Sequence, residues 1–130
     1  MEGIIKAHKE HVSSLGLKCL STVREVDDFV SNDIGLLYFH SLCGCAGMKA
    51  LPIIEELHNT NALPINSGFV FAGQDREATS KAREYLLPNP PSSPSIAVLK
   101  ESKPVLFVSR EQIQDNDTDA IVSRIKEFIL

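Results

Sequence analysis

The spacing of apolar side chains along the chain predicts alternating helices and strands. Apolar residues recur with a helical period in five segments, 4–15, 22–32, 46–58, 75–86 and 115–129. Short apolar runs occupy five others, 17–21, 35–41, 67–72, 95–100 and 104–109. Only three residues separate the last two runs, so we expect them to form a hairpin.

The run 35–41 is predicted to be the central strand. It is almost continuously apolar and carries no charge, which is typical of a strand buried on both faces. The helix before it begins with the capping-box spacing of Thr22 and Glu25. In the helix that follows it, Pro52 removes a backbone hydrogen bond and predicts a kink. Asp75 is the expected N-cap of a later helix.

This order of elements predicts an α/β fold. Helices that alternate with strands imply parallel pairing, and the C-terminal hairpin adds antiparallel strands. We expect a thioredoxin-like fold with a mixed central sheet of about four to five strands and helices on both faces. The 130 residues suffice for one compact domain. We expect this single domain to span 1–130, with 1–16 as an N-terminal helical extension.

Charge and cysteine usage exclude several classes of function. The net charge of -4, without a basic cluster, argues against a nucleic-acid partner. No apolar run is long enough to span a membrane, and the N-terminus lacks the basic and apolar regions of a signal peptide. Three cysteines, two of them one residue apart, do not form a secreted disulfide framework. We therefore expect a cytoplasmic protein with no membrane partner.

Cys43 and Cys45 fall where the central strand gives way to a helix. At a helix N-terminus the free N–H groups and the helix dipole stabilise an anion, which for cysteine is the nucleophilic thiolate. Only Gly44 separates the two thiols, so a disulfide between them would close a very small ring. Strain in such a ring makes the disulfide easier to reduce. This placement alone suits redox chemistry and metal binding equally.

Two other classes of function stay open on this pattern. Two thiolates one residue apart can bind copper or zinc, so the alternative is a non-catalytic soft-metal carrier. No further CxxC motif or obvious histidine pair completes a tetrahedral zinc site, however. The domain would otherwise serve only as an interaction module, in which both cysteines are replaceable.

The remaining cysteine and the histidines have simpler interpretations. Cys19 lies on an apolar strand and is interpreted as a buried core residue. His40, if protonated and facing the thiols, would stabilise a thiolate. Strand alternation gives His40 and Cys43 different parity, which favours a histidine satisfied in the core or pointing to the other face. His8 and His11 stand among charged residues and are interpreted as a solvated face.

Three motifs occur in the order found in a known family. They are Ser41-Leu42-Cys43-Gly44-Cys45-Ala46, then Phe71-Ala72-Gly73-Gln74-Asp75 with Glu77-Ala78-Thr79 and Ala82-Arg83, and finally Pro91-Ser92-Ser93-Pro94-Ser95. Together they resemble the bacilliredoxin family, thioredoxin-like bacterial proteins with a Cys-Gly-Cys site. The resemblance runs from about Leu15 to the C-terminus.

The resemblance implies a thiol–disulfide oxidoreductase. Such a protein removes bacillithiol, or a similar low-molecular-weight thiol, from mixed disulfides on proteins, with weak disulfide isomerase or reductase activity. Its partners would be S-thiolated client proteins and the small thiol, with no cofactor and no metal. Cys43 would be the catalytic nucleophile and Cys45 the resolving thiol. Pro94 matches the cis proline of thioredoxin-like proteins, so Gly44, Ser93 and Pro94 would bind substrate.

The chain departs from the family pattern at three places. His40 stands where the family usually has Asn, and Leu51 stands where an Arg precedes the proline of the helix. Gly47-Met48 replaces the usual Ala-Gly. The missing Arg suggests a substrate of different charge.

Overall fold

The computed structural model describes the backbone of residues 2–41 and 44–129. Its elements are, in chain order, α1 (Glu2–Ser14), β1 (Lys18–Cys19), α2 (Val23–Val30), β2 (Ile34–His40), α3 (Gly44–Asn59), β3 (Ser67–Phe71), α4 (Arg76–Tyr85), β4 (Ser95–Lys100), β5 (Lys103–Val108), α5 (Arg110–Asp115) and α6 (Thr118–Ile129). The alternation of helices and strands confirms the sequence prediction.

The strands form one mixed sheet in the order β1-β3-β2-β4-β5. β3 pairs in parallel with both β1 and β2, whereas β4 runs antiparallel to β2 and to β5. Tyr38 on β2 is paired with Phe69 of β3 on one side and with Ile96 of β4 on the other. β2 is therefore the central strand, as its apolar sequence predicts.

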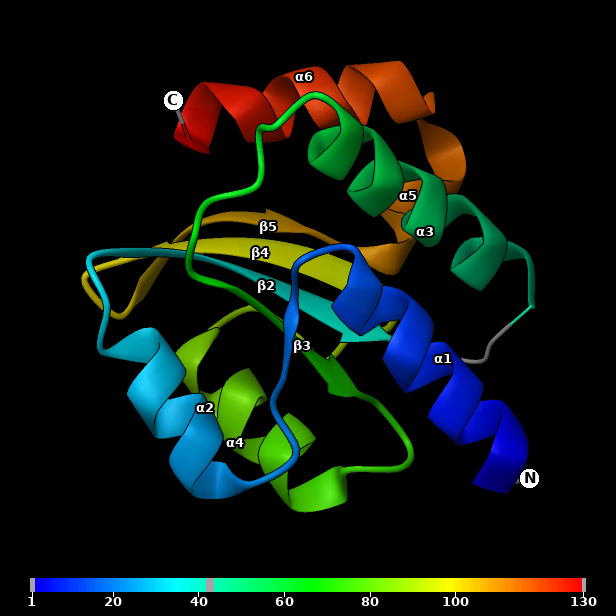
Figure 1. Cartoon of the computed structure of the whole chain (residues 1–130). Helices are drawn as coiled ribbons and strands as arrows, with labels where there is room; N and C mark the ends of the chain where they lie inside the picture. Colours follow the sequence, from blue (N-terminus) through cyan, green and yellow to red (C-terminus); the bar gives the residue numbers. More distant parts are fainter. Residues whose placement is uncertain (1, 42–43, 130) are drawn as a thin grey trace.

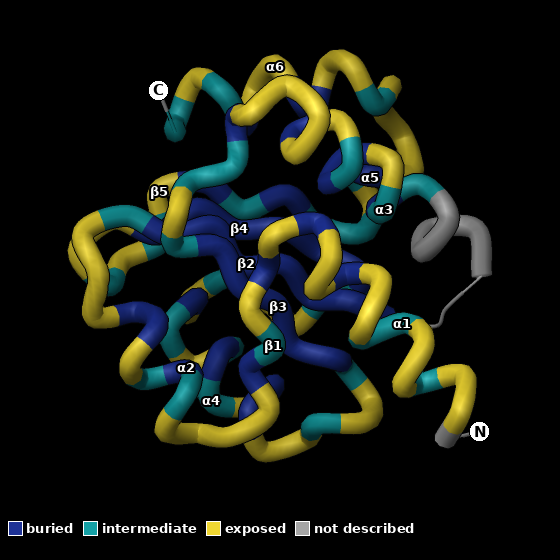
Figure 2. Tube along the Cα trace, viewed as in Figure 1, coloured by how far each residue is buried: buried dark blue, intermediate teal, exposed yellow. Residues whose placement is uncertain are grey.

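Helices cover both faces of this sheet. Figure 1 shows α3 and α6 above it and α2 and α4 below it. Leu36 and Tyr38 of β2 belong to the core beneath α3 and α6, whereas Leu37 and Phe39 belong to the core beside α2 and α4. The three inner strands β2, β3 and β4 are accordingly buried along most of their length, whereas the edge strands β1 and β5 are more exposed (Figure 2). Burial on both faces explains why β2 is apolar at consecutive positions.

The N-terminal helix α1 belongs to the same core as α3. Val12 is fully buried in that core, and Leu15 just beyond the helix is buried there too. The chain then turns at Gly16, which has a φ of +93°. This left-handed conformation strains residues that carry a Cβ, so glycine suits the turn into β1.

Capping boxes begin two of the helices. In α2 the Thr22 hydroxyl accepts a hydrogen bond from the Glu25 backbone, and the Glu25 carboxylate accepts one from the Thr22 backbone, as predicted. Ser109 and Gln112 make the same arrangement at α5. The predicted last helix is α6, which begins at Thr118 and buries Ile121, Val122 and Ile125 as expected. The sequence did not predict α5, which this capping box and buried Ile113 stabilise.

β1 is shorter than predicted, and β5 is shifted by one residue. β1 extends only over Lys18–Cys19 instead of 17–21, since it is an edge strand that pairs with β3 alone. The hairpin turn contains only Glu101 and Ser102, so β5 begins at Lys103. Both turn residues have positive φ, 52° and 65°, as in the type I′ turns that match the twist of paired strands.

Candidate active site

The backbone around the cysteine pair has the predicted strand-to-helix arrangement. β2 ends at His40, and α3 begins at Gly44 and continues to Asn59. Cys43 immediately precedes that helix in the sequence and lies outside the described residues, as do the side chains of residues 44–48. The roles of Cys43, Gly44 and Cys45 therefore stay predictions. The structure describes the residues that surround them.

The loop with Pro94 lies beside the end of β2. Ser95 pairs antiparallel with Phe39, so the residues before Ser95 lie next to the residues after Phe39. The Ser93–Pro94 peptide bond is cis, the form that the resemblance implies, and Pro94 is buried. A second cis bond, Leu87–Pro88, opens the same loop. The substrate-binding roles of Ser93 and Pro94 stay predictions.

Three side chains form a hydrogen-bonded chain at the end of β2. The Tyr38 hydroxyl lies 2.8 Å from Nδ1 of His40, and Nε2 of His40 lies 2.9 Å from Nδ1 of His8 on α1. Tyr38 and His40 are 0% and 1% exposed. The His40 ring also packs edge-on against Phe71, with centroids 5.0 Å apart. His40 is thus a histidine satisfied in the core, on the face of the sheet that α1 and α3 cover.

This environment keeps His40 neutral. Burial of the ring, with further contributions from the charges of His8 and His11, lowers the pKa of His40 from 6.5 to about 4. At neutral pH the ring therefore carries no positive charge and does not act as a cationic partner for a thiolate. The interpretation of His8 as part of a solvated face was wrong, because His8 is half-buried and contacts His40.

An ion pair joins α1 to the start of α4. Lys9 Nζ lies 3.0 Å from Oδ2 of Asp75 and 3.2 Å from Oδ1, and the two side chains are 29% and 15% exposed. Asp75 is the N-cap residue of α4, as predicted, but its side chain makes no capping hydrogen bond. The carboxylate faces Lys9 instead, so α1 is held at this end of the sheet by both Lys9 and His8.

Cys19 lies near this ion pair on β1. Its side chain is partly buried against the core that includes α1 and α3, so it is less buried than the sequence predicts. Burial raises the pKa of the Cys19 thiol, Lys9 opposes that effect, and Asp75 and Glu25 add to it. The thiol is therefore protonated at neutral pH, and a protonated thiol is a poor nucleophile.

No candidate site for a metal ion or a membrane is found among the described residues. They contain no group of three or more His, Cys, Asp and Glu side chains placed to hold a metal ion, and the side chains of the cysteine pair lie outside them. Among the same residues, no helix has the length and apolar character needed to cross a membrane. Leu51 is half-buried and packs against the core under α3.

Sequence comparisons place the chain in a family. A family model described as disulphide isomerase matches residues 1–129, which include the α1 segment that the sequence motifs did not cover. A bacilliredoxin from Cytophaga hutchinsonii is 38% identical over 126 residues, covering 96% of this chain and 93% of the relative. A bacilliredoxin from Bacillus cereus is 36% identical over 129 residues, covering 98% and 90%.

Solved structures with low sequence identity share the fold. A thioredoxin variant from Halobacterium salinarum matches with a TM-score of 0.62 at 19% identity, covering 89% of this chain and 93% of that chain. A thioredoxin from Trypanosoma brucei brucei matches with a TM-score of 0.62 at 15% identity, covering 87% and 90%. The chain therefore has the thioredoxin fold, and it belongs to the bacilliredoxin family.

Proposed function

We propose that this protein is a thiol–disulfide oxidoreductase that removes a low-molecular-weight thiol from mixed disulfides on client proteins. The observation that carries the proposal is the junction between β2, which ends at His40, and α3, which begins at Gly44. A cysteine immediately before a helix gains thiolate stability from the free N–H groups of its first turn. Family membership supports the same class of chemistry.

The proposed reaction consists of two thiol–disulfide exchanges. The Cys43 thiolate attacks the small thiol's sulfur in the mixed disulfide, forms a disulfide with it, and releases the client thiolate, which takes up a proton. The Cys45 thiolate then attacks the Cys43 sulfur, which forms the Cys43–Cys45 disulfide and releases the small thiol. The protein dithiol thus supplies two electrons to the mixed disulfide, and an external thiol reductant must return them.

For the small thiol we propose bacillithiol or a similar compound. The support is the name bacilliredoxin borne by relatives that are 36% and 38% identical. The disulphide isomerase description of the matching family supports weak isomerase or reductase activity on protein disulfides as well. The cysteine usage of the chain supports a reducing compartment, the cytoplasm, as the site of action.

Trapping the first intermediate tests the roles of the two cysteines. A Cys45→Ala variant lacks the resolving thiol, so a client capped with a small thiol should leave that thiol on Cys43. Peptide mapping by mass spectrometry would locate the added mass. Cys19→Ala is the matched control and should not alter trapping. No adduct on Cys43, or an adduct of equal yield on Cys19, would contradict the assignment.

A panel of caps tests the identity of the small thiol. One client protein would be capped at one cysteine with bacillithiol, glutathione or coenzyme A, and release would be followed by mass spectrometry. Faster release of bacillithiol is expected. Equal rates on all three caps would indicate a general oxidoreductase instead.

A further inference from the structure

A surface pocket lies between α4, the Pro94 loop and the start of α5. It is lined by Arg83, Ser92, Ser93 and Arg110, together with Pro91 and the exposed residue Glu111, and its volume is about 270 Å³. We call the first four residues the arginine pocket. Two guanidinium groups and one carboxylate leave this lining with a net positive charge, although the chain as a whole is acidic.

Arg83 carries a donor that the described residues do not satisfy. Its Nε atom is buried and has no hydrogen-bond partner among them, and neither Arg83 nor Arg110 forms an ion pair there. The guanidinium carbon lies 5.9 Å from the centroid of the Phe39 ring, which holds the group against the end of β2. A buried guanidinium N–H without an acceptor is costly. Because Nε itself is shielded from solvent, a carboxylate in the pocket would be held by the terminal N–H groups of the same guanidinium.

The other side of the pocket is fixed by hydrogen bonds between serine hydroxyls and the backbone. The Arg110 N–H donates to the Ser92 hydroxyl at 2.8 Å, and the Ser95 hydroxyl donates to the Ser92 carbonyl at 2.8 Å. These two bonds tie the loop to both α5 and β4. The pocket is therefore largely formed before a ligand arrives, which lowers the entropic cost of binding.

The arginine pocket lies at the same end of the sheet as the strand-to-helix junction. Tyr38, Ile96 and Val108 form one row across β2, β4 and β5. β2 and β5 run in the same direction, so Arg110 lies two residues beyond this row, as His40 does. Arg83 reaches the same end through its contact with Phe39. A substrate bound at this junction therefore lies at the same end of the sheet as the arginine pocket.

We propose that the arginine pocket binds a carboxylate group of the small thiol while that thiol is part of the mixed disulfide. The inference rests on the proposed function and names the class of small thiol preferred, one that carries an anionic group. The volume is close to the lower limit for small-molecule pockets and suits a short acid rather than a folded partner. Arginine is the residue best shaped to hold a carboxylate through two hydrogen bonds.

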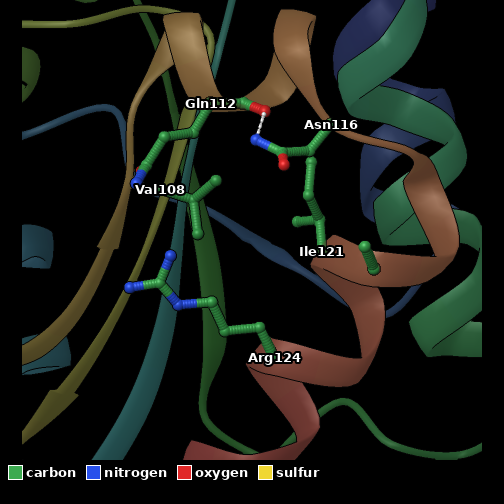
Figure 3. A pocket seen from close by; sticks show the side chains of 6 residues that line it. Val108, Gln112, Asn116, Ile121 and Arg124 are labelled. Atoms are coloured by element: carbon green, nitrogen blue, oxygen red, sulfur yellow. Dashed lines mark hydrogen bonds between the residues drawn. The ribbon is translucent and has the colours of Figure 1, made fainter.

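A second cavity of the molecule provides a control arginine. Figure 3 shows this cavity, about 170 Å³ in volume, where Arg124 of α6 extends toward Val108 and the Asn116 amide donates to the Gln112 carbonyl. Arg124 is exposed and does not line the arginine pocket. An Arg124→Gln variant therefore removes the same charge from the protein without changing the proposed site.

Two matched caps test the inference by activity. The same client cysteine would carry either 3-mercaptopropionate or its neutral amide, 3-mercaptopropionamide, and the two release rates would be compared. The wild-type protein should release the acid about tenfold faster, because only the acid offers a charged acceptor. The preference should fall to about twofold or less in Arg83→Gln and Arg110→Gln, and should persist in Arg124→Gln. Arg83→Lys, which keeps the charge over Phe39, should show an intermediate preference.

A binding measurement separates the pocket from the chemistry. The unreactive thioether 3-(methylthio)propionate would be titrated into the protein and followed by backbone amide NMR, with its amide as the control ligand. The acid alone should shift the signals of Ser92, Ser93 and Arg110, and Arg83→Gln should weaken its binding about tenfold. Acid binding without release of either cap would overturn the proposed function while supporting the anion site. Equal release of both caps, with no selective shift, would overturn the pocket and leave the function standing.

Discussion

At the scale of single residues, His40 at the end of β2 is held by hydrogen bonds to two partners, Tyr38 and His8. A buried imidazole must satisfy both ring nitrogens, and here Tyr38 and His8 do so at 2.8 and 2.9 Å. Neutral histidine presents one donor and one acceptor, which matches this chain of contacts. His40 thereby links the central strand to α1.

Acid should destabilise the fold through His40. Its pKa is about 4 in the folded protein and near 6.5 when unfolded, so between these values the unfolded chain binds a proton that the folded protein does not. The free energy of unfolding should therefore fall by up to about 3 kcal/mol as pH is lowered from 6.5 to 4. Urea unfolding at several pH values measures this, with His40→Gln expected to flatten the dependence.

His58 offers the control for this experiment, because it is an exposed histidine in the last turn of α3. His58→Gln should keep the wild-type pH dependence. An unchanged slope in His40→Gln would show that another group is responsible.

The spacing of Cys43 and Cys45 predicts an oxidising disulfide. If strain in the small ring costs about 2 kcal/mol, the two-electron reduction potential rises by roughly 45 mV above that of thioredoxin, to about −225 mV. One serine inserted after Gly44 would enlarge the ring and should lower the potential by a similar amount. Equilibration in glutathione buffers, read by mass spectrometry, measures both values. An insertion variant with an equal or higher potential would refute the strain argument.

At the scale of elements, α1 is attached to the sheet by polar contacts as well as by its apolar face. Val12 and Leu15 bury their side chains in the core with α3, while His8 and Lys9 reach His40 and Asp75. The contacts of Lys9 and His8 span 66 and 32 residues of sequence. Such contacts form only when the helix is docked.

Lys9→Gln should destabilise the protein by about 1–2 kcal/mol, since it leaves the mostly buried carboxylate of Asp75 without its counter-ion. Lys6→Gln is a matched control on the same helix. The Lys6 pair with Glu10 is 4.0 Å long and its side chains are 79% and 68% exposed, so its loss should change stability by less than about 0.5 kcal/mol. Denaturant unfolding compares the two. Equal effects would mean that the Lys9 contact contributes nothing specific.

The elements that the sequence predicted well are those with one dominant local signal. The uncharged run at 35–41 and the capping box of Thr22 identified β2 and α2 because burial and capping each leave a residue pattern. Helix α5 was missed although Ser109 and Gln112 carry the capping-box spacing, since the segment has little apolar periodicity. β1 was overextended because apolar alternation does not reveal how many residues find a partner strand.

The polar contacts around the candidate site were harder to predict from the sequence. His8 falls on the same helical face as Val12 and Leu15, which was a usable sign of burial, but its charged neighbours suggested solvent. Nothing local could identify His40 as its partner. The arginine pocket combines side chains from α4, the Pro94 loop and α5, so its members share no sequence spacing.

At the scale of the whole molecule, the sheet brings segments that are far apart in the sequence to one end of its strands. β2, β4 and β5 align Tyr38, Ile96 and Val108, so the junction after β2, the Pro94 loop and the start of α5 meet at the same end. α1 closes that end through His8 and Lys9. Residues from four separate parts of the chain would therefore surround the thiol chemistry at the junction.

The most direct test is a single turnover of the reduced protein with an equal amount of a client capped with bacillithiol. Intact-mass spectrometry should show the client losing the mass of its cap while this protein loses two hydrogens, as the Cys43–Cys45 disulfide forms. A Cys43→Ser variant should leave the client capped. The account would be contradicted if the client stayed capped with the wild-type protein, or if the Cys43→Ser variant removed the cap equally well.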